Sequence, residues 1–432
     1  MKKTNNILLS SLLLFSFSVT ASEKTDKIWK QEIKKQALDL SNQSYCYTNE
    51  EGKVEGDNVD MRVRLASVSK LLTSLWAVEK LGVDYTYDLK LFIKGNHLHI
   101  QGSYDPFLGN EKMFYLISQL NELGYERFDS ITFDKNLKIF PDAQLGVSEY
   151  PVLNLAWNAK YVTSYFNTET WSKYRKSEYR EVANLAREGR FLRDINFSVG
   201  EVKSVEANPY LNDPTAKVLT LSSPPLYRYL KELNVKSNNY AAETIFRHLG
   251  GVSKFEQFLK DRFKLTSDQI YFYSGSGLPD VIDGKRKDNY GTCSIVLNLI
   301  SQLKASVEKQ NKEIEDVVAV PGNDKGTFKH RIFSEDYRNS FVAKTGTLYH
   351  TSALAGAMNT RNGFSYFGIF NQSEDISGSK GVQNSMVRAI MTDMGGPMAF
   401  NYEVSVFHTY APETLKDFDY SDDFSTIEGG LF

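Results

Sequence analysis

The chain has 432 residues, of which 41% are hydrophobic and 24% charged, and its formal net charge is −2. This composition is that of a globular protein with enough material for two domains, and it does not fit a disordered chain or a coiled coil. Because the net charge is near zero and no long basic block occurs, the sequence does not support a nucleic-acid binder that relies on phosphate neutralisation.

The first residues combine two lysines, an apolar run from Ile7 to Val19, and small residues up to Ala21. These are the features of a secretory signal peptide, and a run of about 13 apolar residues is too short to span a bilayer as a helix. No later segment is apolar enough to do so. We therefore expect residues 1–21 to be a cleaved signal peptide and the mature protein to be periplasmic, with no membrane span. A retained N-terminal anchor is the alternative.

Local patterns predict the next elements along the chain. Hydrophobic periodicity predicts a helix over about Ala66–Leu81, with Gly82 as its stop. Short alternating runs around Gly95-Asn96 predict two strands joined by a tight turn. From there to about Lys217, strand-like and charged helical stretches are mixed.

Helices and a hairpin are predicted in the last part of the chain. Pro224 and Pro225 open one helix, and a second helical run follows and ends at Gly250. Farther on, NSFVAKTGTL reads as a strand that runs into a glycine turn. Two strand-like runs around Asn362-Gly363 predict a hairpin directly after it. We therefore expect the strand with Lys-Thr-Gly to join an antiparallel sheet.

Cysteine and histidine usage bears on disulfides and metals. The two cysteines, Cys46 and Cys293, can pair in an oxidising compartment, but two cysteines so far apart do not make a disulfide scaffold. We expect two buried free thiols. The six histidines show no ligand spacing such as His-Glu-x-x-His. The sequence therefore disfavours a metal hydrolase and predicts no metal and no cofactor.

Three short motifs follow one another along the chain. They are Ser-x-x-Lys at Ser67–Lys70, Ser-x-Asn at Ser237–Asn239 and Lys-Thr-Gly at Lys344–Gly346. Each alone is weak. On a helix, an inter-helix loop and a sheet strand, together they form the signature of penicillin-binding proteins and serine β-lactamases.

Helix geometry chooses between two candidate serines. Residues three apart on a helix lie on one face, so Ser67 can meet Lys70, whereas Ser69 and Lys70 point about 100° apart. Ser67 is therefore the predicted nucleophile, and Ser69 is a helical residue of unassigned role. Lys70 can serve as the base only if burial and other cations lower its pKa, and Lys344 offers such a second positive charge.

The other motif residues suit the remaining steps of acyl transfer. Ser237 can relay a proton to the leaving amine, and Asn239 can hold both a lysine and a substrate amide. Thr345 offers a hydroxyl to a terminal carboxylate beside Lys344. The small Gly346 lets an acyl-peptide lie alongside the strand, and the backbone N–H groups of Ser67 and Thr347 are suitable oxyanion donors.

With these motifs, the chain resembles the class C low-molecular-mass penicillin-binding proteins, the D-alanyl-D-alanine carboxypeptidase/endopeptidases of the penicillin-binding protein 4 type. GSYDPFLG, SGSGLP and PGNDKGTFKHR resemble further segments of that family. The resemblance implies an α+β, β-lactamase-like transpeptidase fold, in which helices flank a five-stranded antiparallel sheet. It also implies a catalytic domain of residues 22–82 and 218–432, interrupted by one smaller α/β domain of residues 83–217.

The resemblance further implies a secreted serine DD-peptidase that acts on peptidoglycan stem peptides through an acyl-enzyme, as D-alanyl-D-alanine carboxypeptidase and DD-endopeptidase. Its partners would be muropeptides, with β-lactam antibiotics as acylating inhibitors. Two departures from the family concern substrate selectivity. The glycine-rich segment continues into Pro279 and a charged stretch, DVIDGKRKDN. Asn158 and Lys160, beside Trp157, stand where the family has an acid. These departures put a pocket for the free end of diaminopimelate in doubt.

Two rival functions remain open from the sequence. A serine β-lactamase or related esterase would need a device for fast deacylation, such as the Glu-x-x-Leu-Asn loop of class A enzymes, and the sequence shows none. A non-catalytic protein that keeps the penicillin-binding fold is the other. All three motifs retain their reactive side chains, which favours an enzyme.

Overall fold

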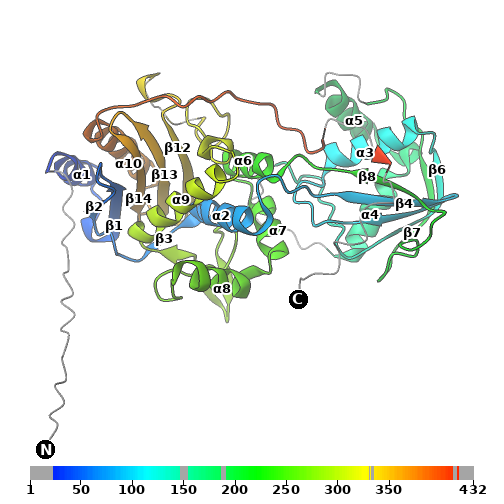
Figure 1. The fold of residues 1–432 in the computed structure, drawn as a ribbon, viewed down its shortest axis with the longest axis horizontal. Helices are drawn as coiled ribbons and strands as arrows, with labels where there is room; N and C mark the ends of the chain where they lie inside the picture. The colour runs from blue at the N-terminus through cyan, green and yellow to red at the C-terminus, as the bar shows by residue number, and fades with distance from the viewer. Residues whose placement is uncertain are drawn as a thin grey trace, which may run out of the picture.

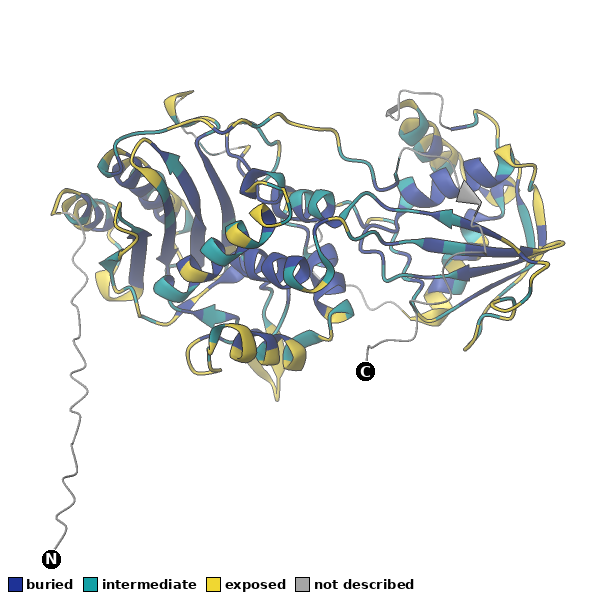
Figure 2. Cartoon of the chain, viewed as in Figure 1, coloured by how far each residue is buried: buried dark blue, intermediate teal, exposed yellow. Residues whose placement is uncertain are grey.

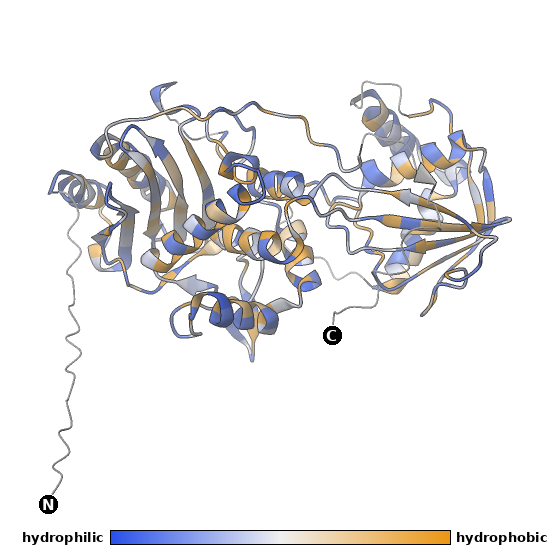
Figure 3. Cartoon of the chain, viewed as in Figure 1, coloured by the Kyte–Doolittle hydropathy of each residue, from blue (hydrophilic) through white to orange (hydrophobic). Residues whose placement is uncertain are grey.

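The computed structural model describes residues 23–145, 154–185, 191–329, 331, 335–411 and 416–417. The predicted signal peptide lies outside these residues. Figure 1 shows two halves side by side, each built on its own sheet with helices against it. The central strands of both sheets are largely buried and rich in apolar side chains (Figures 2 and 3). No helix in the described part of the chain is long and apolar enough to cross a membrane.

The first half, called here the five-stranded half, contains an antiparallel sheet in the order β12-β13-β14-β1-β2. The strands are β1 Gln43–Thr48, β2 Val54–Asp57, β12 Phe341–Leu348, β13 Thr351–Thr360 and β14 Gly363–Asn371. The hairpin predicted around Asn362-Gly363 is formed by β13 and β14. The Lys-Thr-Gly strand is β12 at the sheet edge, so one side of its backbone is available to other groups.

Helices cover both faces of this sheet. Side chains alternate along each strand, so both faces carry apolar side chains that pack against helices. Tyr45 and Tyr47 pack in one core with α1 Glu23–Lys35 and α10 Ile376–Asp393. Cys46 between them points into the other core, which contains α2 Ser69–Leu81 and α9 Cys293–Glu308. The remaining helices of this half are α6 Leu226–Lys236, α7 Asn239–His248 and α8 Gly251–Phe263. Short strands here are β3 Val63–Arg64, β9 Asp280–Ile282, β10 Lys285–Lys287 and β11 Tyr290–Gly291. The short 3-10 helices are η1 Leu40–Asn42, η2 Ala66–Val68, η4 Ile314–Asp316 and η5 Glu335–Tyr337.

The second half, called the six-stranded half, contains a mixed sheet in the order β15-β8-β4-β5-β6-β7. Its strands are β4 Leu89–Lys94, β5 His97–Gln101, β6 Arg127–Phe133, β7 Ser198–Ser204, β8 Lys217–Leu221 and β15 Lys416–Asp417. Its helices are α3 Asn110–Glu122, α4 Leu155–Tyr165, η3 Thr168–Thr170 and α5 Lys173–Leu185. These elements enclose their own apolar core. The fold is therefore α+β with a transpeptidase-like antiparallel sheet, as the sequence predicted.

The expectation of two free thiols is wrong, because Cys46 and Cys293 form a disulfide with a Cα–Cα distance of 6.0 Å. Their separation of 247 residues along the chain hides a direct contact in space. Cys46 lies in β1, and Cys293 opens α9, which packs across that strand. The bond therefore fixes a helix to the sheet inside one core.

A C-terminal segment, residues 397–411 and called here the strap, runs back from the five-stranded half to the six-stranded half (Figure 1). On the way, the Ser405 hydroxyl accepts a hydrogen bond from Arg228 of α6 at 2.8 Å. At its far end, the ring of Tyr410 stacks on that of Tyr115 in α3, with centroids 3.9 Å apart. Beyond it, β15 pairs with β8. The end of the chain thus contributes to the six-stranded half.

Candidate active site

Ser67 lies in a tight turn that directly precedes α2. The predicted helix begins with η2, Ala66–Val68, and continues as an α-helix from Ser69 to Leu81, with Gly82 at its end. Ala66 has a φ of 47°, a left-handed conformation that is uncommon for a residue other than glycine. Strained residues of this kind persist where their surroundings fix them, and they cluster at functional sites.

Two glycines allow other segments to pack closely on this turn. A Cβ at Gly346 of β12 would lie 2.9 Å from the Cβ of Ala66 and 3.1 Å from the backbone nitrogen of Ser67. A Cβ at Gly277 would lie 1.9 Å from the carbonyl oxygen of Ala66. Gly346 was predicted to make room for an acyl-peptide. The structure supplies a second reason for it, the close approach of the strand to the turn.

Lys70 lies at the centre of the candidate site and is fully buried. Its Nζ donates to Ser67 Oγ at 2.9 Å, to Asn239 Oδ1 at 2.7 Å and to the carbonyl oxygen of Ser276 at 2.7 Å. An ammonium group has three N–H donors, and all three are used. The structure thus brings Ser67, Lys70 and Asn239 together, and helical spacing predicts the first of these two contacts.

The two lysines of the site are shifted towards the neutral form. Burial, and then the positive charge of Lys344, lower the pKa of Lys70 well below its ordinary value, while the carboxylate of Glu243 acts in the opposite direction. Burial lowers the pKa of Lys344 to about 7. Near neutral pH, a lysine with a lowered pKa can accept a proton from a serine hydroxyl, which an ordinary lysine cannot.

The Ser-x-Asn motif forms the junction between α6 and α7. Ser237 ends α6 in a left-handed conformation with a φ of 55°, and this reverses the chain direction. Asn238 caps α7 by accepting from the backbone N–H of Ala241, and its Nδ2 donates to the carbonyl oxygen of Ala143 at 2.6 Å. Asn239 then opens α7 with its side chain on Lys70. The predicted loop thus also contacts the segment between β6 and α4 of the six-stranded half.

The strand β12 presents Lys344, Thr345, Gly346 and Thr347 at the edge of the sheet. Backbone groups of a strand alternate between its two sides. Ala343 donates its N–H outside the sheet, to the carbonyl oxygen of Ala319 at 2.9 Å. Thr345 and Thr347 share this orientation because they lie two and four residues further on. The N–H of Thr347 therefore faces the free edge, where an oxyanion donor is required.

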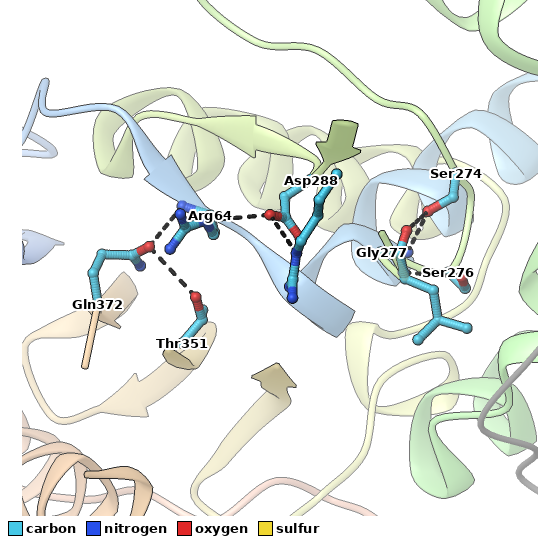
Figure 4. Close-up of polar contacts among 9 residues, drawn as sticks. Arg64, Ser274, Ser276, Gly277, Asp288, Thr351 and Gln372 are labelled. Atoms are coloured by element: carbon cyan, nitrogen blue, oxygen red, sulfur yellow. Dashed lines mark hydrogen bonds and ion pairs between the residues drawn. The ribbon is translucent and has the colours of Figure 1, made fainter. Parts of the chain in front are cut away.

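Sequence reasoning gave no role in the site to the supporting loop of residues 274–278, part of which is drawn in Figure 4. Its Ser276 carbonyl binds Lys70, and the side chain of Asn289 donates to Ser274 O at 2.7 Å and to Ser69 Oγ at 3.0 Å. Ser69 therefore has a structural partner. The SGSGLP resemblance pointed to this loop, but nothing in the local sequence marks Asn289 or the buried Glu243 behind it.

A cationic pocket of about 460 Å³ lies beside β3, on the segment that leads to Ser67. Arg64 and Arg286 both pair with Asp288, as Figure 4 shows in part. Gln372 accepts from the backbone N–H of Arg64. The charged stretch after Pro279 thus forms the exposed hairpin β9–β10 and one wall of this pocket.

Asn158 and Lys160, the two residues beside Trp157 that stand where the related family has an acid, have other contacts. Asn158 is buried, accepts from the backbone N–H of Ile139 at 3.1 Å and donates to the carbonyl oxygen of Leu137 at 2.6 Å. Lys160 lies over the exposed ring of Trp157, 4.9 Å from its centroid. Asn158 therefore supports the fold of the six-stranded half.

Comparisons with known proteins show what the chain is similar to. The model of the D-Ala-D-Ala carboxypeptidase 3 (S13) family matches residues 195–392. The Bd3459 predatory endopeptidase from Bdellovibrio bacteriovorus, solved in complex with immunity protein Bd3460, is 26% identical over 87% of this chain and 98% of that chain, with a TM-score of 0.80. Its penicillin G acylated form, also with Bd3460, is 26% identical over the same shares, with a TM-score of 0.76.

Penicillin-binding protein 4 from Haemophilus influenzae shares the fold at 15% identity, over 84% of this chain and 99% of that chain, with a TM-score of 0.58. No curated protein sequence matches the chain. The family match covers the Ser-x-Asn and Lys-Thr-Gly motifs, and the structural matches extend over most of the chain. The chain is therefore similar to the S13 peptidases over residues 195–392, it shares the fold of penicillin-binding protein 4, and it is a serine peptidase.

Proposed function

We propose that this protein is a secreted, periplasmic serine DD-peptidase that cleaves peptidoglycan stem peptides, with both D-alanyl-D-alanine carboxypeptidase and DD-endopeptidase activity. The observation that carries the proposal is the contact of 2.9 Å between Lys70 Nζ and Ser67 Oγ inside a buried site. A second buried lysine on β12, with a pKa of about 7, adds the positive charge that such a base requires.

The proposed reaction is acyl transfer through Ser67. Neutral Lys70 takes the hydroxyl proton as Ser67 Oγ attacks the carbonyl of a D-alanine residue. The N–H groups of Ser67 and Thr347 hold the oxyanion. The C–N bond then breaks, and the leaving amine receives a proton through Ser237. Water hydrolyses the resulting ester and regenerates the serine.

Two scissile bonds fit the same site. The D-Ala-D-Ala bond and the D-Ala to diaminopimelate cross-link both follow a D-alanine carbonyl, and both leave a carboxylate that Thr345 and Lys344 can hold. The names of the similar Bdellovibrio structures describe them as endopeptidases and, in one case, as acylated by penicillin G. This supports muropeptides as substrates and β-lactams as acylating inhibitors of this chain as well.

The predicted domain division belongs to the proposal. Residues 83–217 would form the single inserted domain, and residues 22–82 and 218–432 the catalytic domain. The pairing of β8 with β4 carries the six-stranded sheet on to Leu221, which favours an end of the insertion a few residues later. A cleft bordered by one inserted domain leaves room for a bulky leaving group.

The test is to incubate the purified enzyme with monomeric pentapeptides and with cross-linked dimers, and to separate the products by chromatography. Both substrates should be cleaved, and Ser67→Ala should abolish cleavage of each. Intact dimers beside trimmed pentapeptides at high enzyme concentration would remove the endopeptidase activity from the proposal. Fast turnover of a chromogenic cephalosporin would instead indicate a β-lactamase.

A labelling experiment checks the choice of serine. Fluorescent penicillin should acylate the wild type and Ser69→Ala, because the Ser69 hydroxyl accepts a hydrogen bond from Asn289 and has a structural role. Ser67→Ala should remain unlabelled. Intact-mass data with the reverse pattern would overturn the assignment of the nucleophile.

A further inference from the structure

The contacts of Lys70 decide where its lone pair points once it is neutral. A neutral amine keeps two N–H donors and gains one acceptor site. Of its three partners, Asn239 Oδ1 and the carbonyl oxygen of Ser276 can only accept, whereas the hydroxyl of Ser67 can also donate. The two carbonyl oxygens therefore hold the two hydrogens, and the lone pair is directed at Ser67.

Ser276, which carries this carbonyl, is itself hydrogen-bonded to Glu243 through its N–H and its hydroxyl. Glu243 of α7 is buried, and its Oε1 accepts from the backbone N–H of Ser276 at 3.0 Å and from the Ser276 hydroxyl at 2.8 Å. The Ser276 N–H and the carbonyl of Gly275 belong to one peptide group, and both are hydrogen-bonded. The Thr73 hydroxyl donates to this carbonyl oxygen at 2.7 Å. The loop thus has little freedom to move its Ser276 carbonyl away from Lys70.

We propose that Glu243 is a positioning residue for the acylation step: by holding Ser276, it fixes the carbonyl that aims the amine of Lys70 at Ser67. The inference rests on the proposed function, in which Lys70 is the base. No motif contains Glu243, and the residue does not touch the reacting atoms.

Glu243 also acts through its charge. Two other charged groups lie near Glu243 and Lys70. Lys344 on β12 disfavours a protonated Lys70, and the Nε of Arg247 on α7 lies 3.9 Å from Glu243 Oε2. Arg247 is largely exposed, with 62% of its side chain accessible, so water screens it. The carboxylate of Glu243 raises the pKa of Lys70, and its removal should lower that pKa further.

The experiment measures the acylation rate of the mature protein by fluorescent penicillin across pH 5–9 in four variants. Glu243→Gln keeps an oxygen that can hold Ser276 but loses the charge. Its plateau rate should stay within about tenfold of wild type, and its acid limb should move to lower pH. Glu243→Ala loses the contact as well, and its plateau should fall about 10²-fold, the loss that a misplacement of about 1 Å brings.

Two variants separate contact from charge. Ser276→Ala removes one of the two hydrogen bonds to Glu243 and keeps the carboxylate, so its plateau should fall while its acid limb stays in place. Glu256→Gln removes a carboxylate from the neighbouring helix α8 and should change neither quantity. If Glu243→Gln and Glu243→Ala both keep the wild-type rate and pH profile, the proposal is wrong.

A second measurement does not depend on activity. Titration of the Lys70 side chain by carbon NMR, assigned with Lys70→Met, should give a lower pKa in Glu243→Gln than in the wild type. An unchanged pKa in a folded Glu243→Gln variant also contradicts the proposal. Failure of the wild type to be acylated would overturn the proposed function, whereas this titration would still test Glu243.

Discussion

Buried lysines occur in both halves of the molecule, and their partners differ. In the six-stranded half, Lys112 of α3 is fully buried, and its Nζ lies 2.6 Å from Asp105 Oδ2, which is also buried. In the five-stranded half, Lys70 and Lys344 are just as buried, but hydroxyl, amide and carbonyl oxygens hold them. The carboxylate of Asp105 neutralises the charge of Lys112, whereas no opposite charge contacts Lys70 or Lys344 among these hydrogen bonds.

This difference separates a structural lysine from a reactive one. A carboxylate partner compensates for the desolvation of a buried ammonium group and yields an ion pair that supports the fold. Neutral acceptors leave the desolvation cost in place, so the pKa falls, as it does at Lys70 and Lys344. Residue type and burial are therefore the same in both halves, and the partner decides the role.

The largest expected effect is on the reactive side of this comparison. Lys70→Met should lower the acylation rate by about 10²- to 10⁴-fold, the usual contribution of a general base. Because burial disfavours the ammonium form that Lys70 keeps in the unfolded chain at neutral pH, its removal should not lower the free energy of unfolding. Acylation kinetics and urea denaturation measure the two quantities. A wild-type rate in this variant would exclude Lys70 as the base.

The structural side should give the opposite pattern. Lys112→Met leaves Asp105 as a buried carboxylate without its ammonium partner, so we expect a loss of about 3–5 kcal/mol in the free energy of unfolding. The rate of acylation per folded molecule should stay unchanged. Adding Asp105→Asn should recover most of the stability, because the charge is then gone from both sides. A Lys112→Met variant as stable as wild type would break the comparison.

The disulfide distinguishes the two halves further, since it lies in the five-stranded half alone within the described chain. Replacing Cys46 and Cys293 together by alanine should cost about 2–4 kcal/mol. Hydrogen exchange should speed up in β1 and α9, while β4 and β5 keep their protection. Equal loss of protection in both sheets would show that the halves unfold as one unit.

The smallest effect concerns pH. As pH rises through about 7, Lys344 loses its charge in the free enzyme, so kcat/KM for a carboxylate-bearing substrate should fall on that limb. A bound substrate carboxylate favours the charged lysine and raises its pKa, so the alkaline limb of kcat should lie at higher pH. Coincident alkaline limbs would argue against contact between Lys344 and the substrate carboxylate.

Local sequence predicted the elements that carry the motifs, because helix periodicity, turn residues and short spacing act over a few residues. The helix with Ser67 and Lys70, the hairpin at Asn362-Gly363 and the edge strand with Lys344 are of this kind. The resemblance to a known family then supplied the five-stranded sheet.

Contacts between distant segments were not accessible in this way. The disulfide joins one residue before β4 to one after β8, so most of the six-stranded half lies between them along the chain. Glu243 reads as an ordinary helical glutamate until the loop of Ser276 is seen to pack against it. Likewise, Asn289 gives Ser69 its partner from far along the chain. These features depend on tertiary packing, for which no local pattern exists.

The strap bears on the rotational freedom of the two halves. Two chain crossings, from α2 to β4 and from β8 to α6, would by themselves act as a hinge. The strap adds a third crossing, because the Tyr229 hydroxyl of α6 donates to its Thr409 carbonyl and its Ala411 N–H donates to the Ser222 carbonyl directly after β8. The strap should therefore limit rotation of one half against the other through the catalytic cycle, and substrate size would be selected by a fixed arrangement of the two halves rather than by domain closure.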